Sequence, residues 1–153
     1  MKPGQFSERS SAALATCDER LQRLFNDVVA IHDCTVAEGH RGQELQDRYF
    51  REGRSHLRWP DGRHNSSPSR AVDVWPYLRG IGVPWAETLM RLGYTRPQAD
   101  EGCRLAFALF AGVVLATAAR QGVGVRHGAN WDGDELVAID QKFDDWPHWE
   151  LVG

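Results

Sequence analysis

The sequence lacks a Cys-x-x-Cys pair and has only three cysteines, Cys17, Cys34 and Cys103. An odd number of cysteines without such a pair indicates neither a disulfide framework nor a thiolate metal site. We therefore expect all three cysteines to be reduced thiols in the core.

Apolar runs of membrane-spanning length are also missing. The most apolar stretch, from Leu105 to Ala119, falls short of the roughly 20 residues that a spanning helix needs. We expect it to form a helix between Arg104 and Arg120 that is buried in the core and ends at Gly122. The segment from Met1 to Phe6 has no apolar signal core, so we expect synthesis in a cytoplasm and no stable membrane insertion.

Strong basic charge, internal repeats and low-complexity segments are absent as well. A net charge of -3 argues against a strongly basic nucleic-acid-binding protein. The chain has 153 residues, of which 42% are apolar and 25% charged, as in an ordinary globular domain. We expect one domain over residues 1–153, without a separate wall-binding module, that acts as a monomer.

Hydrophobic periodicity predicts both helices and strands. Apolar residues spaced by three and four from Leu14 to Ile31 predict a helical face, with Asp18 as a possible start of a second helical segment. Stretches with alternating polar and apolar residues or with β-branched residues predict strands, and two stretches between them predict helices. The strands are expected at 34–38, 71–75, near 122–126 and at 148–152, and further helices at 43–52 and 85–92. The fold class is therefore α+β, with a small, mainly antiparallel sheet and helices packed against one side.

Two stretches combine imidazoles with carboxylates, namely His64 to Asp73 and Asp145 to Leu151. Pro68 and its neighbouring serines predict a loop after His64, while alternation places Asp73 and His148 on two strands that we expect to be neighbours. Two histidines and a carboxylate are the ligands of catalytic zinc sites, which leave one position for water. The residues alone leave structural roles open, since a single histidine is more often structural than a ligand.

Arg41 lies in the turn 39–42, between a predicted strand and a predicted helix. From the pattern alone, a surface ion pair explains Arg41 as well as a site role does. The following loop, 53–63, is long enough to suggest a function. Its basic residues could face an anionic polymer, but a solvated run of charges is the simpler interpretation, and His56 is expected at the surface. The arginines in and beside the loop are Arg51, Arg54, Arg58 and Arg63.

The loop from Asn130 to Glu135 is acidic enough to suggest Ca²⁺. It lacks the twelve-residue EF-hand pattern. A turn capped by Asn and Asp side chains is therefore favoured over a calcium site.

Three segments, from Glu38 to Gly42, from His64 to Asp73 and from Asp145 to Leu151, together resemble the L-alanyl-D-glutamate endopeptidases of phage endolysins. These enzymes belong to a zinc peptidase family that also contains D-Ala-D-Ala carboxypeptidases and dipeptidases. The resemblance covers nearly the whole chain, in order and spacing. It departs from the family pattern after His127, where relatives often read Trp-Gly-Gly-Asp-Trp and this chain reads His-Gly-Ala-Asn-Trp.

This resemblance implies one Zn²⁺ ion bound by His64, Asp73 and His148. It also implies Asp145 as the catalytic base and Arg41 near the reacting carbonyl. The implied reaction is hydrolysis of the L-Ala to D-Glu bond of peptidoglycan stem peptides.

The resemblance also implies a cellular setting. The protein would be made in the host cytoplasm and act at the periplasmic cell wall after a holin or similar partner permeabilises the membrane. Two alternatives stay open: a D-Ala-D-Ala carboxypeptidase or dipeptidase on the same scaffold, and a non-catalytic zinc-containing binding domain of the hedgehog kind.

Overall fold

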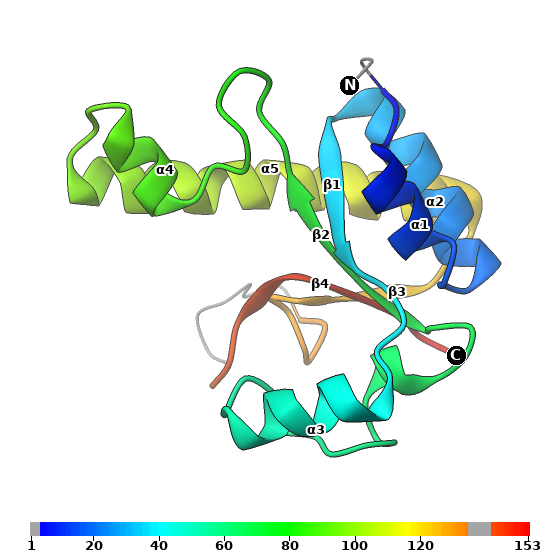
Figure 1. Cartoon of the computed structure of the whole chain (residues 1–153). Helices are drawn as coiled ribbons and strands as arrows, with labels where there is room; N and C mark the ends of the chain where they lie inside the picture. Colours follow the sequence, from blue (N-terminus) through cyan, green and yellow to red (C-terminus); the bar gives the residue numbers. More distant parts are fainter. Residues whose placement is uncertain (1–3, 135–141) are drawn as a thin grey trace.

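The computed structural model in Figure 1 describes residues 4–134 and 142–153. Two sequence predictions reach beyond these ranges. Met1 to Pro3 form part of the segment without a signal core, and Glu135 closes the acidic loop considered for calcium.

Helices and strands are interspersed along the described chain, and the strands form one sheet. The helices are α1 (Glu8–Leu14), α2 (Glu19–Ile31), α3 (Gln43–Arg51), the 3-10 helix η1 (Arg63–Asn65), α4 (Ala86–Arg91) and α5 (Arg96–Gln121). The strands are β1 (Cys34–Glu38), β2 (Ala71–Pro76), β3 (Val125–Gly128) and β4 (Asp145–Leu151). They pair in the order β1-β2-β4-β3, and every pair is antiparallel. The predicted α+β class with a small antiparallel sheet is confirmed.

The helical period from Leu14 to Ile31 runs across two helices. Ser7 caps α1, because its hydroxyl accepts a hydrogen bond from the Ser10 N–H at 3.2 Å. Asp18 caps α2 in the same way, accepting from the Arg20 N–H at 2.9 Å. The predicted second helical segment at Asp18 is thus confirmed.

The core lies between the sheet and the layer formed by α1, α2 and α5, which cover one side of it, whereas α3 lies on the other side (Figure 1). From α2, Phe25 meets the edge of Trp149 on β4 with ring centroids 6.4 Å apart. All three cysteines are free thiols, and Cys17 and Cys34 belong to this core as predicted. The predicted core position is wrong for Cys103, which is only half-buried on α5.

Helix α5 begins earlier than predicted and is buried on one face only. Thr95 caps its start, since the Thr95 N–H donates to Gln98 Oε1 at 3.0 Å, and Gly122 ends it in the left-handed conformation at φ 66°, as expected. Phe110 and Val114 are buried, but the side of Leu105 and Leu109 faces outward, with 61% and 65% exposed. The prediction of a helix buried in the core is therefore wrong for the outward face of α5. By length and composition α5 could also cross a membrane, as could the core helix of many soluble proteins.

Candidate metal centre

The three predicted zinc ligands converge in the structure. Asp73 on β2 lies directly opposite His148 on β4 in the sheet register, and η1 brings His64 over both. His64 Nε2 lies 3.2 Å from Asp73 Oδ1 and 3.2 Å from His148 Nδ1, and the latter two atoms are also 3.2 Å apart. Three residues from distant parts of the sequence thus aim one ligand atom each at a common point.

This triangle of ligand atoms fits a zinc ion. Ligands about 2.0 to 2.1 Å from a tetrahedral Zn²⁺ ion lie roughly 3.3 Å from one another. Two imidazole nitrogens and one carboxylate oxygen also form a typical zinc ligand set. Within residues 4–134 and 142–153, this is the group of His, Cys, Asp or Glu side chains placed to hold a metal ion.

The electrostatics of the cluster favour a positive charge. Burial alone would raise the pKa of Asp73, but the charges of His64 and His148 and their hydrogen bonds to the carboxylate outweigh it and hold that pKa well below its usual range. Burial alone would lower the pKa of His148, whereas hydrogen bonds to Asp73 and Glu150 raise it to about 9. The carboxylates that hold this proton also attract a metal ion, which has to displace the proton from Nδ1 in order to bind.

A close backbone approach positions His64. Its Nδ1 bonds the carbonyl oxygen of Gly39 at 2.7 Å, which leaves Nε2 directed at the cluster. A Cβ atom at Gly39 would overlap the Ala13 carbonyl oxygen and the Thr16 hydroxyl. Only glycine therefore allows the end of β1 to lie this close to the turn after α1.

Arg41 forms a buried ion pair with Glu38 and borders the cluster. Its Nε and Nη2 donate to the two carboxylate oxygens of Glu38, each at 2.9 Å, and Nη1 donates to Gln46 Oε1 at 3.1 Å. Nη2 also lies 3.7 Å from Asp73 Oδ2, and the side chain is only 11% exposed. The predicted ion pair of Arg41 is present but lies buried and not at the surface, and it holds the guanidinium beside the cluster.

Buried amides connect Arg41 to the segment that carries His64. The fully buried Gln46 accepts from Arg41 and from Asn65 Nδ2, the latter at 3.1 Å, and donates to the Leu57 carbonyl at 2.6 Å. Asn65 Nδ2 also donates to the carbonyl of Arg41 at 3.0 Å. Sequence reasoning missed Gln46 and Asn65, because nothing in a helix sequence marks a polar residue that points inward.

Asp145 stands at the start of β4, next to the cluster. Burial and the negative charge of Asp73 raise the pKa of Asp145. Its carboxylate makes no hydrogen bond to another residue of the described chain, so it is available to take a proton. This placement agrees with the expected role as a base.

Two pockets meet at the cluster, and Arg41 and Asp145 line both. One, of about 320 Å³, contains His64 and His148. The other, of about 670 Å³, contains Asp73. The smaller pocket is also lined by Arg54, His56, Arg63 and Trp131, and the larger by Tyr49, Trp75 and Trp85. A ligand that extends into both pockets would cross the cluster between them.

The segment from His127 to Asp134, where the chain departs from the family pattern, reaches the site through Trp131. The Trp131 ring lies 5.2 Å from that of His148, while His127 is buried and stacks on Trp149 at 4.1 Å. Asn130 Oδ1 accepts from the Gly133 N–H at 3.0 Å. This is the predicted Asx-type turn, and the described part of the loop presents no cluster that could hold a calcium ion.

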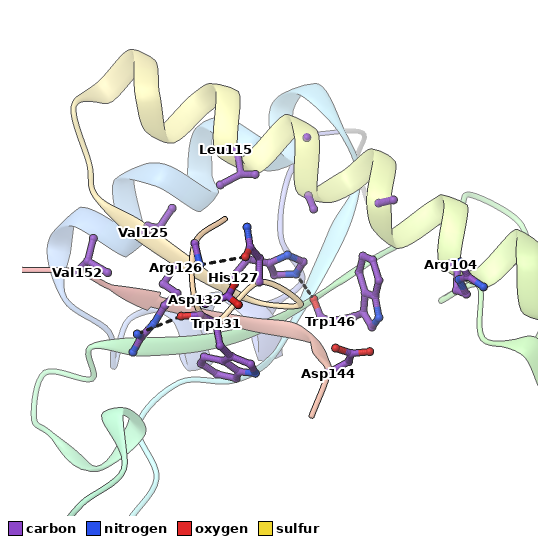
Figure 2. A pocket seen from close by; sticks show the side chains of 15 residues that line it. Arg104, Leu115, Val125, Arg126, His127, Trp131, Asp132, Asp144, Trp146 and Val152 are labelled. Carbon is purple, nitrogen blue, oxygen red and sulfur yellow. Dashed lines mark hydrogen bonds between the residues drawn. The ribbon is translucent and has the colours of Figure 1, made fainter. Parts of the chain in front are cut away.

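A further pocket, of about 1120 Å³, adjoins the smaller of these two, because Arg126 and Trp131 line both (Figure 2). Leu115 of α5, Val125 of β3 and Trp146 of β4 are among the side chains around it. Of the described residues that line it, none is one of the three clustered ligands. The chemistry expected of the cluster therefore concerns the two smaller pockets.

Comparisons with known proteins support the fold. No protein-family model matches the sequence, and no curated protein does. Among solved structures, the chain is similar to the crystal structure of the Serratia marcescens L-Ala D-Glu endopeptidase ChiX, with 21% sequence identity and a TM-score of 0.67. The similarity covers 97% of this chain and 91% of that chain. At this identity the likeness shows a shared fold, and the chain is thus folded like an L-Ala D-Glu endopeptidase over nearly its whole length.

Proposed function

We propose that the protein is a zinc-dependent peptidoglycan endopeptidase that hydrolyses the L-Ala to D-Glu bond of stem peptides. The observation that carries this proposal is the triangle of His64, Asp73 and His148, which fits zinc and lies in a fold shared with an L-Ala D-Glu endopeptidase. Bound zinc would supply a Lewis acid that activates water and polarises a carbonyl group.

Asp145 is proposed as the general base. Asp145 lies beside the cluster and lines both pockets, so a water molecule and a peptide bound in these pockets would be within its reach. A carboxylate with a raised pKa holds the proton taken from water better and can deliver it to the leaving amine.

Arg41 is proposed to stabilise negative charge on the reacting carbonyl. Glu38 and Gln46 take three of its five N–H groups and fix the guanidinium in place. The remaining N–H groups of Arg41 can donate to an oxygen atom of a substrate bound in the two pockets that Arg41 lines. A donor held in place before the reaction stabilises developing charge most effectively.

The arginines of the smaller pocket support an acidic substrate. Arg63 is half exposed, and its nearest ion-pair contact is Glu150 Oε1 at 3.9 Å. The Arg54 guanidinium lies 3.9 Å from the Tyr49 ring centroid. D-Glu in a stem peptide carries a free carboxylate, which arginines recognise well.

The cellular role is proposed with the activity. The protein would be an endolysin, made in the host cytoplasm, that reaches the periplasmic wall once a holin or similar partner has permeabilised the membrane. It would act as a monomer and a single domain, without binding nucleic acid.

Metal removal and reconstitution test the proposal. Dialysis against a chelator should abolish solubilisation of purified peptidoglycan, and one equivalent of Zn²⁺ should restore it. Full activity of protein shown by elemental analysis to be metal-free would refute the zinc mechanism. Zinc-loaded protein that cleaves no wall fragment would favour the non-catalytic binding domain.

A further inference from the structure

The second ring nitrogen of His148 has a dedicated partner that the ligand set leaves out. Nδ1 faces Asp73 and His64, while Nε2 lies 3.1 Å from Glu150 Oε2. His148 and Glu150 are two residues apart on β4, so their side chains lie on the same face of the sheet. A neutral imidazole that binds a metal through Nδ1 carries its proton on Nε2, where Glu150 can accept it.

Glu150 is itself held in place. Its side chain is 5% exposed, and Arg126, its partner across the β3–β4 pair, donates to Oε1 through Nη2 at 2.5 Å and Nε at 3.1 Å. Each carboxylate oxygen thus has a separate task, Oε1 toward Arg126 and Oε2 toward His148. A buried carboxylate paired with an arginine is a strong and well-oriented acceptor.

The two imidazoles of the cluster are supported differently. His64 Nδ1 bonds the main-chain oxygen of Gly39, which a side-chain substitution elsewhere does not remove. The corresponding nitrogen of His148 depends on the side chain of Glu150. Of the two histidines, His148 is therefore the one whose metal binding a side-chain substitution at its hydrogen-bond partner can weaken.

We infer that Glu150, held by Arg126, is a positioning residue that keeps the Nδ1 lone pair of His148 directed at the metal ion. This inference rests on the proposed zinc site but not on the bond that the protein cleaves. Partners of this kind typically contribute 10- to 100-fold to metal affinity.

Zinc affinity measured by chelator competition, with no wall substrate present, tests the inference. Glu150→Ala should weaken zinc binding by roughly 10- to 100-fold. Glu150→Gln should recover only part of this loss, because its single amide oxygen can accept the Nε2 proton only if the amide nitrogen faces Arg126. Glu52→Ala removes an exposed carboxylate away from the cluster, 3.8 Å from Arg54, and should bind zinc like the unaltered protein.

Zinc affinity of Glu150→Ala within twofold of the unaltered protein would overturn the inference.

A second measurement uses the unaltered protein and so does not depend on whether a variant folds. Long-range ¹H–¹⁵N spectra of the zinc-loaded protein should show the His148 proton on Nε2, and a proton on Nδ1 would contradict the inference. Tight zinc binding without wall hydrolysis would refute the proposed function alone. Absence of zinc binding would refute both the proposed zinc site and the role inferred for Glu150.

Discussion

Asp145 and His148 lie three residues apart on β4 and are expected to have different roles, one in proton transfer and one in metal binding. Asp145→Asn keeps the size of the side chain but removes the proton acceptor. We predict that this variant binds zinc and unfolds at the same temperature as the unaltered protein, while kcat falls by about 10² to 10⁴. Zinc content, thermal melting and peptidoglycan hydrolysis measured on one preparation check the prediction.

The neighbouring Asp144 provides the matched control, since it lines the pocket of Figure 2 and neither pocket at the cluster. Asp144→Asn should hydrolyse peptidoglycan at a normal rate. Near-normal hydrolysis by Asp145→Asn would remove Asp145 from the mechanism.

His127 makes the stability of the fold dependent on pH. Burial lowers its pKa from 6.5 to about 4, although a hydrogen bond to the Trp146 carbonyl opposes this effect. Between these two pH values the unfolded chain binds a proton and the folded chain does not, so acid favours unfolding. The stabilisation is complete above pH 6.5 and is lost as the pH falls through about 4.

We predict that His127→Gln flattens this dependence. Between pH 7 and pH 4, the metal-free parent should lose more free energy of unfolding than the variant, by a difference on the order of 3 kcal/mol. Urea unfolding at a series of pH values measures it. His56→Gln, which changes an exposed histidine, should behave like the parent, and parallel curves for His127→Gln and the parent would refute the prediction.

At the scale of elements, the end of β1 is pressed against the turn after α1 at Gly39. Gly39→Ala would force the Ala13 carbonyl oxygen and the Thr16 hydroxyl to move, and the displaced Gly39 carbonyl would no longer fix His64. We predict a loss of stability of about 1 to 3 kcal/mol together with weaker zinc binding. Chemical unfolding and chelator competition measure the two effects.

Gly42 is the matched control, because a Cβ atom there meets nothing within 4 Å. Gly42→Ala should leave zinc affinity nearly unchanged and should lower stability only by the cost of alanine at the N-cap of α3, less than Gly39→Ala does. If the two variants behave alike, close packing at Gly39 does not position the metal site.

The sequence predicts elements whose signals are local. Cap residues Ser7 and Asp18, the β-branched run of β1 and the left-handed Gly122 fix helix ends and a strand without information from elsewhere. The pairing of Asp73 with His148 was also predictable, because alternation places each residue on a strand and the family resemblance implies that both bind one metal ion.

Features that depend on tertiary contacts were not predictable in this way. The buried amide of Gln46 and the carboxylate of Glu150 look like surface residues until the chain folds around them. The outward face of α5 was also missed, because a nearly uniform run of Ala, Leu and Val does not show which side packs on the sheet.

For the whole molecule, the metal cluster connects η1 to the paired strands β2 and β4, and its three ligands come from distant parts of the sequence. Because the unfolded chain does not hold these ligands together, zinc should stabilise the fold by mass action. We predict a gain of about 2.7 kcal/mol at a free zinc concentration roughly 100 times the dissociation constant. Thermal melting with and without zinc measures it.

His64→Ala removes one ligand and should abolish this zinc-dependent stabilisation. A variant of an exposed histidine outside the cluster, His56→Ala, should retain it. Equal stabilisation of His64→Ala and the parent would place the zinc ion elsewhere in the protein.

The identity of the cleaved bond tests the central claim most directly. Peptidoglycan digested with the zinc-loaded protein would be analysed by mass spectrometry of the released fragments. The account predicts new free carboxyl groups on L-Ala and new amino groups on D-Glu. Release of D-Ala with the L-Ala to D-Glu bond intact would contradict it and assign the site to a D-Ala-D-Ala carboxypeptidase or dipeptidase.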